Sequence, residues 1–96
     1  MKFLSTWQVR PGATKEAVAR FLAGQAAPPA GVKMPGRWHK ADLSGGYTLV
    51  ESDSPEAMYE NAAQWIDVLE IHGSVVVEDA EAGPILAKVF NESRRT

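Results

Sequence analysis

Residues 32–51, VKMPGRWHKADLSGGYTLVE, predict a pair of adjacent strands and thereby decide the fold. The Ser-Gly-Gly sequence at 44–46 supplies the positive φ that a tight turn between two strands requires. Pro35 cannot donate a ladder hydrogen bond, so we expect it near a sheet edge or a bulge. If the first two residues of 44–46 form the turn, His39 lies opposite Val50; a longer loop would shift this pairing.

The flanking segments supply the remaining elements. Residues 2–9 carry apolar side chains on both sides, which predicts a central strand covered on both faces. Ser54 followed by Pro55 is a strong helix-start signal. The expected elements are a strand at 2–9, a helix at 13–23, the two strands of 32–51, a helix from 55, a strand at 70–79 and a helix at 80–92. This β-α-β-β-α-β order predicts a ferredoxin-like α+β fold with an added C-terminal helix, in which two helices cover one face of a four-stranded antiparallel sheet.

Each predicted helix carries an apolar stripe at helical spacing. We expect Thr14 to cap the first helix and Pro84 to lie near the first turn of the last. The stripes comprise Val18, Phe21 and Leu22 in the first helix, Met58, Ala62, Trp65, Ile66 and Leu69 in the second, and Ile85, Leu86, Val89 and Phe90 in the last. Lys15, Glu16, Arg20, Gln64 and Asp67 fall on the solvated sides. The last stripe is expected to dock on the domain or on a partner.

Length and composition predict one domain over residues 1–96. The net charge is −2 and no face concentrates Lys and Arg, so no nucleic acid is expected as a partner. The chain has no cysteine, which excludes disulfides and thiolate metal sites and fits a reducing compartment. It shows neither a signal peptide nor an apolar run long enough to span a bilayer. We therefore expect a soluble, cytoplasmic protein with no membrane contact.

The second face of the sheet predicts self-association. Either Trp7 or Thr6, and either His39 or Trp38, must point toward the face that the two helices leave uncovered. A small domain rarely leaves such a face bare. The expected partner is a second copy of the chain, in a homodimer whose two sheets meet face to face.

Several segments resemble the DUF3303 domains. These segments are PPAGVKMPGRWHKAD, the strand LVES, and PEAMYENAAQWIDVLE followed by VVVEDAEAGPILAKV. The likeness extends over residues 1–89 and is most specific at 36–39 (GRWH) and 63–65 (AQW). It implies a protomer of the dimeric α/β-barrel superfamily and carries little function, because the family is named for an unknown role.

The wider superfamily includes cofactor-independent monooxygenases, isomerases and haem-degrading enzymes, whose ligands lie between the sheet and its helices. The haem-degrading branch uses an Asn on the first strand with a Trp and a His on a helix. Trp65 matches, but the first strand offers Ser5, Thr6 and Trp7, and His72 falls at the start of a strand. The resemblance therefore implies no haem, and we expect no cofactor.

Arg37 and His39 are the candidate catalytic residues. Alternation places both on one side of their strand, with Trp38 on the other. An imidazole titrates near neutral pH and can move a proton, and a guanidinium can hold an anion. The alternative is an edge strand with solvated charges and one packed Trp. His39 and His72 lack metal-ligand spacing, so no metal is expected.

Aromatic residues provide candidate ligand-binding positions. The candidates are Trp7, Trp38, Tyr47 and Trp65, together with Glu51 and His72. The aromatic side chains can line a pocket for a planar apolar ligand, or they can be core or interface packing. Glu51 is a candidate base if it is buried, and otherwise marks the point where its strand leaves the core.

Two functional hypotheses follow. The first is a homodimer that binds a small apolar or aromatic molecule in a cleft lined by Trp7, Trp38, His39 and Trp65. The second is a cofactor-independent enzyme of the monooxygenase or isomerase kind, with His39 as proton shuttle and Arg37 as anion anchor. An enzyme requires His39 inside a cavity with a hydrogen-bond partner, whereas a binding protein does not.

Overall fold

One antiparallel sheet organises the computed structural model, which describes residues 1–91. Its strands are β1 (Lys2–Val9), β2 (Lys33–His39), β3 (Gly45–Glu51) and β4 (Leu69–Val76), and their order in the sheet is β2-β3-β1-β4. The prediction that the first strand is central is confirmed. β1 pairs with β3 along one edge and with β4 along the other. The expectation that both of its faces are covered is not met within one chain, because Leu4 is 45% exposed.

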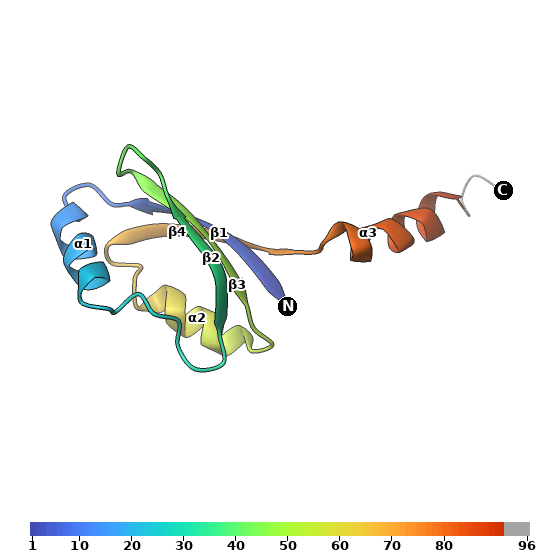
Figure 1. The fold of residues 1–96 in the computed structure, drawn as a ribbon, viewed down its shortest axis with the longest axis horizontal. Helices are drawn as coiled ribbons and strands as arrows, with labels where there is room; N and C mark the ends of the chain where they lie inside the picture. Colours follow the sequence, from blue (N-terminus) through green and yellow to red (C-terminus); the bar gives the residue numbers. More distant parts are fainter. Residues whose placement is uncertain (92–96) are drawn as a thin grey trace.

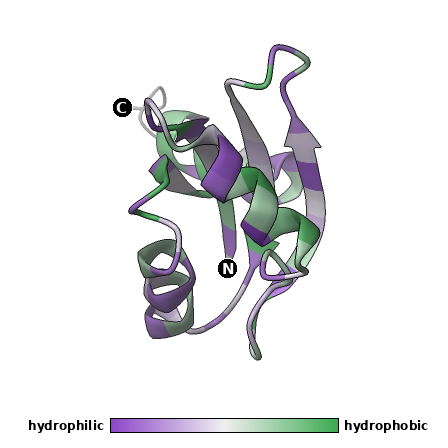
Figure 2. Cartoon of the chain, turned by 90° about the vertical axis from the view of Figure 1, so that its left-hand side faces the viewer, coloured by the Kyte–Doolittle hydropathy of each residue, from purple (hydrophilic) through white to green (hydrophobic). Residues whose placement is uncertain are grey.

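Helices α1 (Thr14–Leu22) and α2 (Pro55–Ala63) lie on the same side of the sheet, as Figure 1 shows. The predicted β-α-β-β-α-β order is confirmed, and the added helix α3 (Asp79–Leu86) continues into a π-helical segment, η1 (Ala87–Asn91). Figure 2 shows that the helices carry both hydrophobic and hydrophilic residues, as expected for elements that cover a sheet on one side only. The predicted end of the last helix, Glu92, lies outside the described residues.

The predicted turn at 44–46 is wrong. The loop runs from Lys40 to Ser44, and its positive φ belongs to Leu43 at 66°. Gly45 and Gly46 are buried members of β3. A Cβ built on Gly46 would lie 2.4 Å from the Trp7 indole and 2.2 Å from the Trp38 carbonyl oxygen, so these glycines serve close packing instead of a turn.

The longer loop also changes the predicted strand register. His39 lies opposite Gly46 instead of Val50, and Trp38 lies opposite Tyr47. Pro35 occurs on the edge strand β2, within a register irregularity between Lys33 and Gly36, which confirms its predicted position.

Two predictions about the helices need correction. Thr14 is the first residue of α1 and not its cap; Ala13 holds the cap position and makes no side-chain hydrogen bond. The helix α2 ends at Ala63, so Trp65, Ile66 and Leu69 lie in the turn and strand that follow it. The start of α2 is confirmed, because the Ser54 hydroxyl accepts a hydrogen bond of 3.1 Å from the Ala57 N–H.

The C-terminal segment departs from the predicted boundaries. β4 ends at Val76 instead of residue 79, and α3 begins at Asp79. Pro84 lies inside α3 and not in its first turn, so its ring removes a hydrogen bond from the helix interior. In Figure 1, α3 projects away from the sheet and from the other two helices.

The uncovered face of the sheet exposes large apolar side chains. The most buried apolar residues are Ala17, Val32, Val50 and Val68. Leu4, Trp38 and Tyr47 instead face solvent, with exposed fractions of 45%, 56% and 43%. Within residues 1–91, no helix combines the length and hydrophobicity needed to cross a bilayer.

Candidate functional site

A cavity of about 290 Å³ lies between the sheet and helices α1 and α2. Its size is near the lower end of the range for small-molecule sites. The strands contribute the residues that point toward the helices, because alternate positions of β1 and β3 share a face. Its lining includes Ser5, Trp7 and Val9 from β1, Thr48 and Val50 from β3, Val18 and Phe21 from α1, Met58 and Ala62 from α2, and Trp65.

Trp7 forms part of the cavity wall, and its ring is held in place by contacts with β3. Its indole Nε1 donates a hydrogen bond of 3.0 Å to the Thr48 hydroxyl on the neighbouring strand. The missing side chain of Gly46 leaves room for the ring. The indole is thus held by one polar contact and by a close approach to the backbone of β3.

His39 enters the cavity from the last position of β2. Its ring makes edge contacts with Trp7, at 5.3 Å between ring centroids, and with Phe21, at 5.1 Å. Among the described residues, no side chain or carbonyl hydrogen-bonds to this imidazole. His39 therefore has aromatic neighbours, but no group that would orient it for proton transfer.

Arg37 lines the same cavity two residues earlier on β2. Its guanidinium donates to the Ala26 carbonyl oxygen, lies against the Met34 sulfur, and stands over the Phe21 ring with Cζ 5.5 Å from the centroid. Desolvation lowers the pKa of Arg37 from its ordinary value. No carboxylate within residues 1–91 pairs with it, so its positive charge is held in an apolar wall without a counter-charge.

The charged side chains of the cavity wall all have one sign. Arg37 and Lys40 are the charged residues of the lining, His39 adds an imidazole, and no Asp or Glu of the described chain lines the cavity. This asymmetry is local, because the whole chain carries more acidic than basic residues. The remaining wall is mostly apolar and aromatic. No group of three or more His, Asp or Glu side chains in the described region could hold a metal ion.

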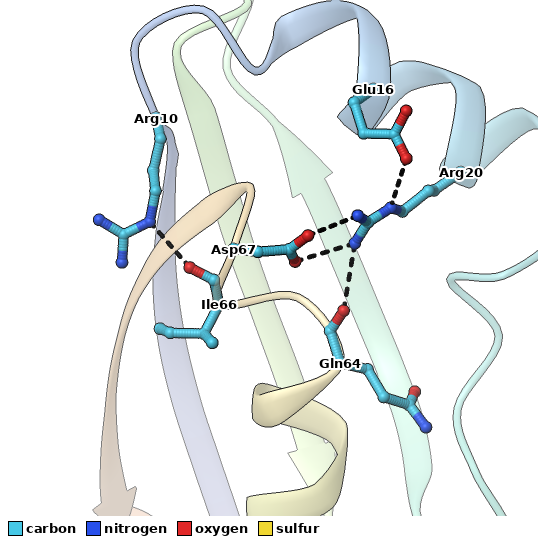
Figure 3. Close-up of polar contacts among 6 residues, drawn as sticks. All are labelled: Arg10, Glu16, Arg20, Gln64, Ile66 and Asp67. Carbon is cyan, nitrogen blue, oxygen red and sulfur yellow. Dashed lines mark hydrogen bonds and ion pairs between the residues drawn. The ribbon is translucent and has the colours of Figure 1, made fainter.

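An ion-pair network secures the two helices beside the cavity (Figure 3). Arg20 of α1 makes two hydrogen bonds to the Asp67 carboxylate, of 3.0 and 2.6 Å, and one of 3.2 Å to the Gln64 carbonyl oxygen. Glu16 accepts a further bond of 3.0 Å from Arg20. Asp67, ahead of Glu16, raises the pKa of Arg20, and Arg20 in turn lowers the pKa of Asp67. These bonds join α1 to the turn that follows α2, which carries Trp65.

The structure brings together four of the eight predicted site residues. Trp7, Arg37, His39 and Trp65 line the cavity. The other four, which are Trp38, Tyr47, Glu51 and His72, lie outside it. The expectation that Trp38 lines the same cleft as Trp7 is therefore corrected: Trp38 follows Arg37 on β2, and its side chain takes the opposite face of the sheet.

Those four residues make contacts of their own. Trp38 lies over Gly36, where an added Cβ would come within 2.3 Å of its ring. Lys40 Nζ stands 5.7 Å from the centroid of the Tyr47 ring. The carboxylate of Glu51 lies 3.5 Å from Lys2 Nζ, and the exposed ring of His72 lies 3.2 Å from the Glu70 carboxylate.

Three residues in or beside the cavity wall were not predicted as site residues. Phe21 was assigned only to an apolar helix stripe, although it contacts both His39 and Arg37. Thr48 shares a strand face with Val50, and this alternation is a usable signal. Arg20 was placed on the solvated side of its helix; its i,i+4 spacing from Glu16 predicts one contact but not the contact with Asp67.

Comparison with known proteins identifies a family and supports the fold. The model of a domain of unknown function, DUF3303, matches residues 1–90. Rv0793 from Mycobacterium tuberculosis is similar in structure, with a TM-score of 0.50 and 15% sequence identity; the match covers 82% of this chain and 96% of that one. A candidate antibiotic biosynthesis monooxygenase from Chloroflexus aurantiacus gives a TM-score of 0.45 and 17% identity, over 80% of this chain and 93% of that one. No protein with a curated description matches the sequence.

Proposed function

The chain belongs to the DUF3303 family, and we propose that it binds a small aromatic molecule carrying an anionic group in the cavity between its sheet and helices α1 and α2. The observation that carries the proposal is the composition of the cavity wall. Trp7, Phe21 and Trp65 offer aromatic surface, and the charged positions are all basic. Such a wall favours a planar apolar body with a negative charge at one end.

Arg37 is the proposed anchor for the negative group. Its guanidinium is partly desolvated and has no carboxylate partner in the described chain, so an anionic ligand would supply the missing counter-charge. His39 lies on the same strand face, where its ring would border the ligand. Trp65 is proposed to contact the apolar body of the ligand.

The test is a titration of intrinsic Trp fluorescence with 2-naphthoate and with its neutral amide, 2-naphthamide. We expect saturable quenching and tighter binding of the carboxylate, because a charge-assisted hydrogen bond contributes about 1.5–3 kcal/mol, or roughly 10- to 150-fold in affinity. Arg37→Met should remove this preference while keeping the apolar stem. Lys33→Met is the matched control, since Lys33 is an exposed basic residue on the same strand and does not line the cavity.

Equal affinity for the two compounds, or an equal loss in both variants, would contradict the proposed anchor. Quenching that rises linearly without saturation would contradict the binding site itself. A circular dichroism spectrum of each variant should match that of the unmodified chain. This control separates a loss of binding from a loss of folding.

A second candidate function is an enzyme with His39 as general acid or base. The observation in its favour is the position of the imidazole in the cavity beside Trp7. Binding is favoured over catalysis because no hydrogen-bond partner in residues 1–91 orients the ring. Conversion of a bound aromatic acid that is abolished in His39→Gln would reverse this preference.

A further inference from the structure

A row of three polar residues crosses the cavity face of the sheet. The strand register places Arg37 of β2 opposite Thr48 of β3, and Thr48 opposite Ser5 of β1. All three residues line the cavity. Residues that are opposite each other in a sheet share a face, so the three side chains lie side by side on neighbouring strands. Ser5 is two strand spacings from Arg37, which is about 10 Å between the Cα atoms.

Apolar side chains flank this polar row. On the same face of the sheet, two residues along each strand, Trp7 of β1 lies on one side of the row and Val50 of β3 lies on the other. The row is therefore a polar strip in a largely apolar wall. Its two ends differ in chemistry, because one end carries a guanidinium and the other carries a hydroxyl.

The three polar groups differ in the hydrogen bonds they already make. The Thr48 hydroxyl accepts a bond of 3.0 Å from the Trp7 indole, and the Arg37 guanidinium donates to the Ala26 carbonyl oxygen. Ser5 is half-buried, and its hydroxyl has no hydrogen-bond partner in the described chain. A ligand that fills the cavity would remove water from this hydroxyl and would have to supply a hydrogen bond in its place.

The neighbouring strand leaves space for the Ser5 hydroxyl. Gly73 of β4 lies opposite Ser5, and a Cβ built on Gly73 would come within 2.9 Å of Ser5 Oγ. A glycine inside a strand weakens the strand and often marks a close approach. The hydroxyl thus leans toward β4, at the end of the row that is farther from Arg37.

We propose that the cavity selects an aromatic acid that carries a hydroxyl group at the end opposite its anionic group, and that Ser5 recognises this hydroxyl. The inference rests on the proposed function, because Arg37 holds the anionic group in both. The Ser5 hydroxyl can donate and accept, so it can pair with a ligand hydroxyl in either direction. A ligand without that group would leave the Ser5 hydroxyl covered and unpaired, which costs affinity.

The test compares three ligands by isothermal titration calorimetry with the full chain. They are 6-hydroxy-2-naphthoate, with the hydroxyl far from the acid, 3-hydroxy-2-naphthoate, with the hydroxyl beside the acid, and unsubstituted 2-naphthoate. We expect 6-hydroxy-2-naphthoate to bind about 2- to 12-fold more tightly than 2-naphthoate, which is the range that one neutral hydrogen bond contributes. The 3-hydroxy isomer should show no gain that depends on Ser5.

Two variants test the recognition of the hydroxyl. Ser5→Ala should remove the preference for 6-hydroxy-2-naphthoate over 2-naphthoate. Gly73→Ala should reduce the same preference, because its Cβ would displace the Ser5 hydroxyl. The matched control is Thr6→Ala, since Thr6 is the next residue of β1, is exposed and does not line the cavity. Thr6→Ala should keep the preference, and circular dichroism should show that all three variants are folded.

The outcomes separate this inference from the proposed function. Equal affinities for 6-hydroxy-2-naphthoate and 2-naphthoate in the unmodified chain would overturn the inference, and so would a preference that survives both Ser5→Ala and Gly73→Ala. If 2-naphthoate still binds more tightly than 2-naphthamide in those cases, the proposed function stands and only the recognition of the hydroxyl fails. If 2-naphthoate binds no more tightly than its amide, the proposed function fails and this inference fails with it.

Discussion

Replacing Gly46 with Ala should destabilise the protein markedly, because Gly46 is the point where β3 makes room for Trp7. The new Cβ would lie 2.4 Å from the Trp7 ring and 2.2 Å from the Trp38 carbonyl oxygen. The oxygen belongs to the paired backbone of β2, so it cannot move without disturbing the ladder. The indole is held by its hydrogen bond to Thr48. Neither neighbour is the free end of a flexible side chain.

The expected cost is about 3 kcal/mol, at the upper end of the 1–3 kcal/mol typical of overpacking. For a chain of this size, this corresponds to a fall in Tm of roughly 12 to 24 °C. Urea unfolding followed by Trp fluorescence gives the free energy of unfolding, and it should be run at one protein concentration because dimerisation would add to stability. The same experiment reports on Trp7, whose emission should change as its ring is displaced.

Gly83→Ala is the matched control for Gly46→Ala. Gly83 lies in α3, and a Cβ there would meet nothing within 4 Å. Removing a helix glycine usually stabilises by about 0.5–1 kcal/mol, so the unfolding midpoint should not fall. A Gly46→Ala midpoint within error of the unmodified protein would refute the conclusion that this glycine is required by close packing against Trp7.

Two further predictions concern helix contacts. Arg20→Met should lower the urea midpoint more than Lys15→Met on the same helix, because Arg20 forms the ion pair that joins α1 to Asp67. Because Arg20 lowers the pKa of Asp67, the stability from this pair is present above the unfolded pKa of about 3.9 and is lost as the pH falls through the lower folded pKa. The loss of stability between about pH 6 and about pH 3 should therefore be shallower in Arg20→Met than in the unmodified chain. Parallel profiles would contradict the pairing. Ser54→Ala should lower the free energy of unfolding by about 1 kcal/mol, because it removes the cap of α2, whereas Thr14→Ala should be nearly neutral. Urea unfolding that ranks the two variants in the reverse order would contradict the observed caps.

Local chemistry explains which parts of the fold were predictable from the sequence. Ser54 and Pro55 act within a single helical turn, so they identify the start of α2 without knowledge of the rest of the chain. Pro35 likewise restricts its own strand to an edge position. These signals, with the segment order, were enough to predict a four-stranded sheet with two helices on one face.

The turn at 44–46 was mispredicted because its cause is not local. Two adjacent glycines between strands normally indicate a turn, but here Gly46 faces Trp7 on a strand that is distant in the sequence. Leu43, which no turn preference favours, takes the positive φ instead. The error displaced the expected register, since a register depends on loop length and not on the strands alone.

The site was predictable only to the level of strand faces. The alternation of side chains along a strand predicted that Arg37 and His39 share one face and that Trp38 lies on the other. It left undecided which face points toward the helices, because aromatic residues occur on both. Arg20 and Asp67 each look like solvated helix residues, and their contact depends on how α1 packs beside the turn after α2. Such pairing across elements has no signature in a single sequence.

The alternation of β2 also separates the cavity from the face of the sheet that the helices leave uncovered. Arg37 and His39 face the cavity, whereas Trp38, between them, faces outward. Trp38→Lys therefore adds a charge to the uncovered face of the sheet, where the sequence predicts a second copy of the chain, and places none in the cavity. Arg37→Met changes the cavity without altering that face. If Trp38→Lys yields a folded monomer that still prefers 2-naphthoate over 2-naphthamide, the cavity is complete within one chain. If that preference disappears together with the dimer, association is required to hold β2 in its binding geometry, because the edge strand is paired on one side only.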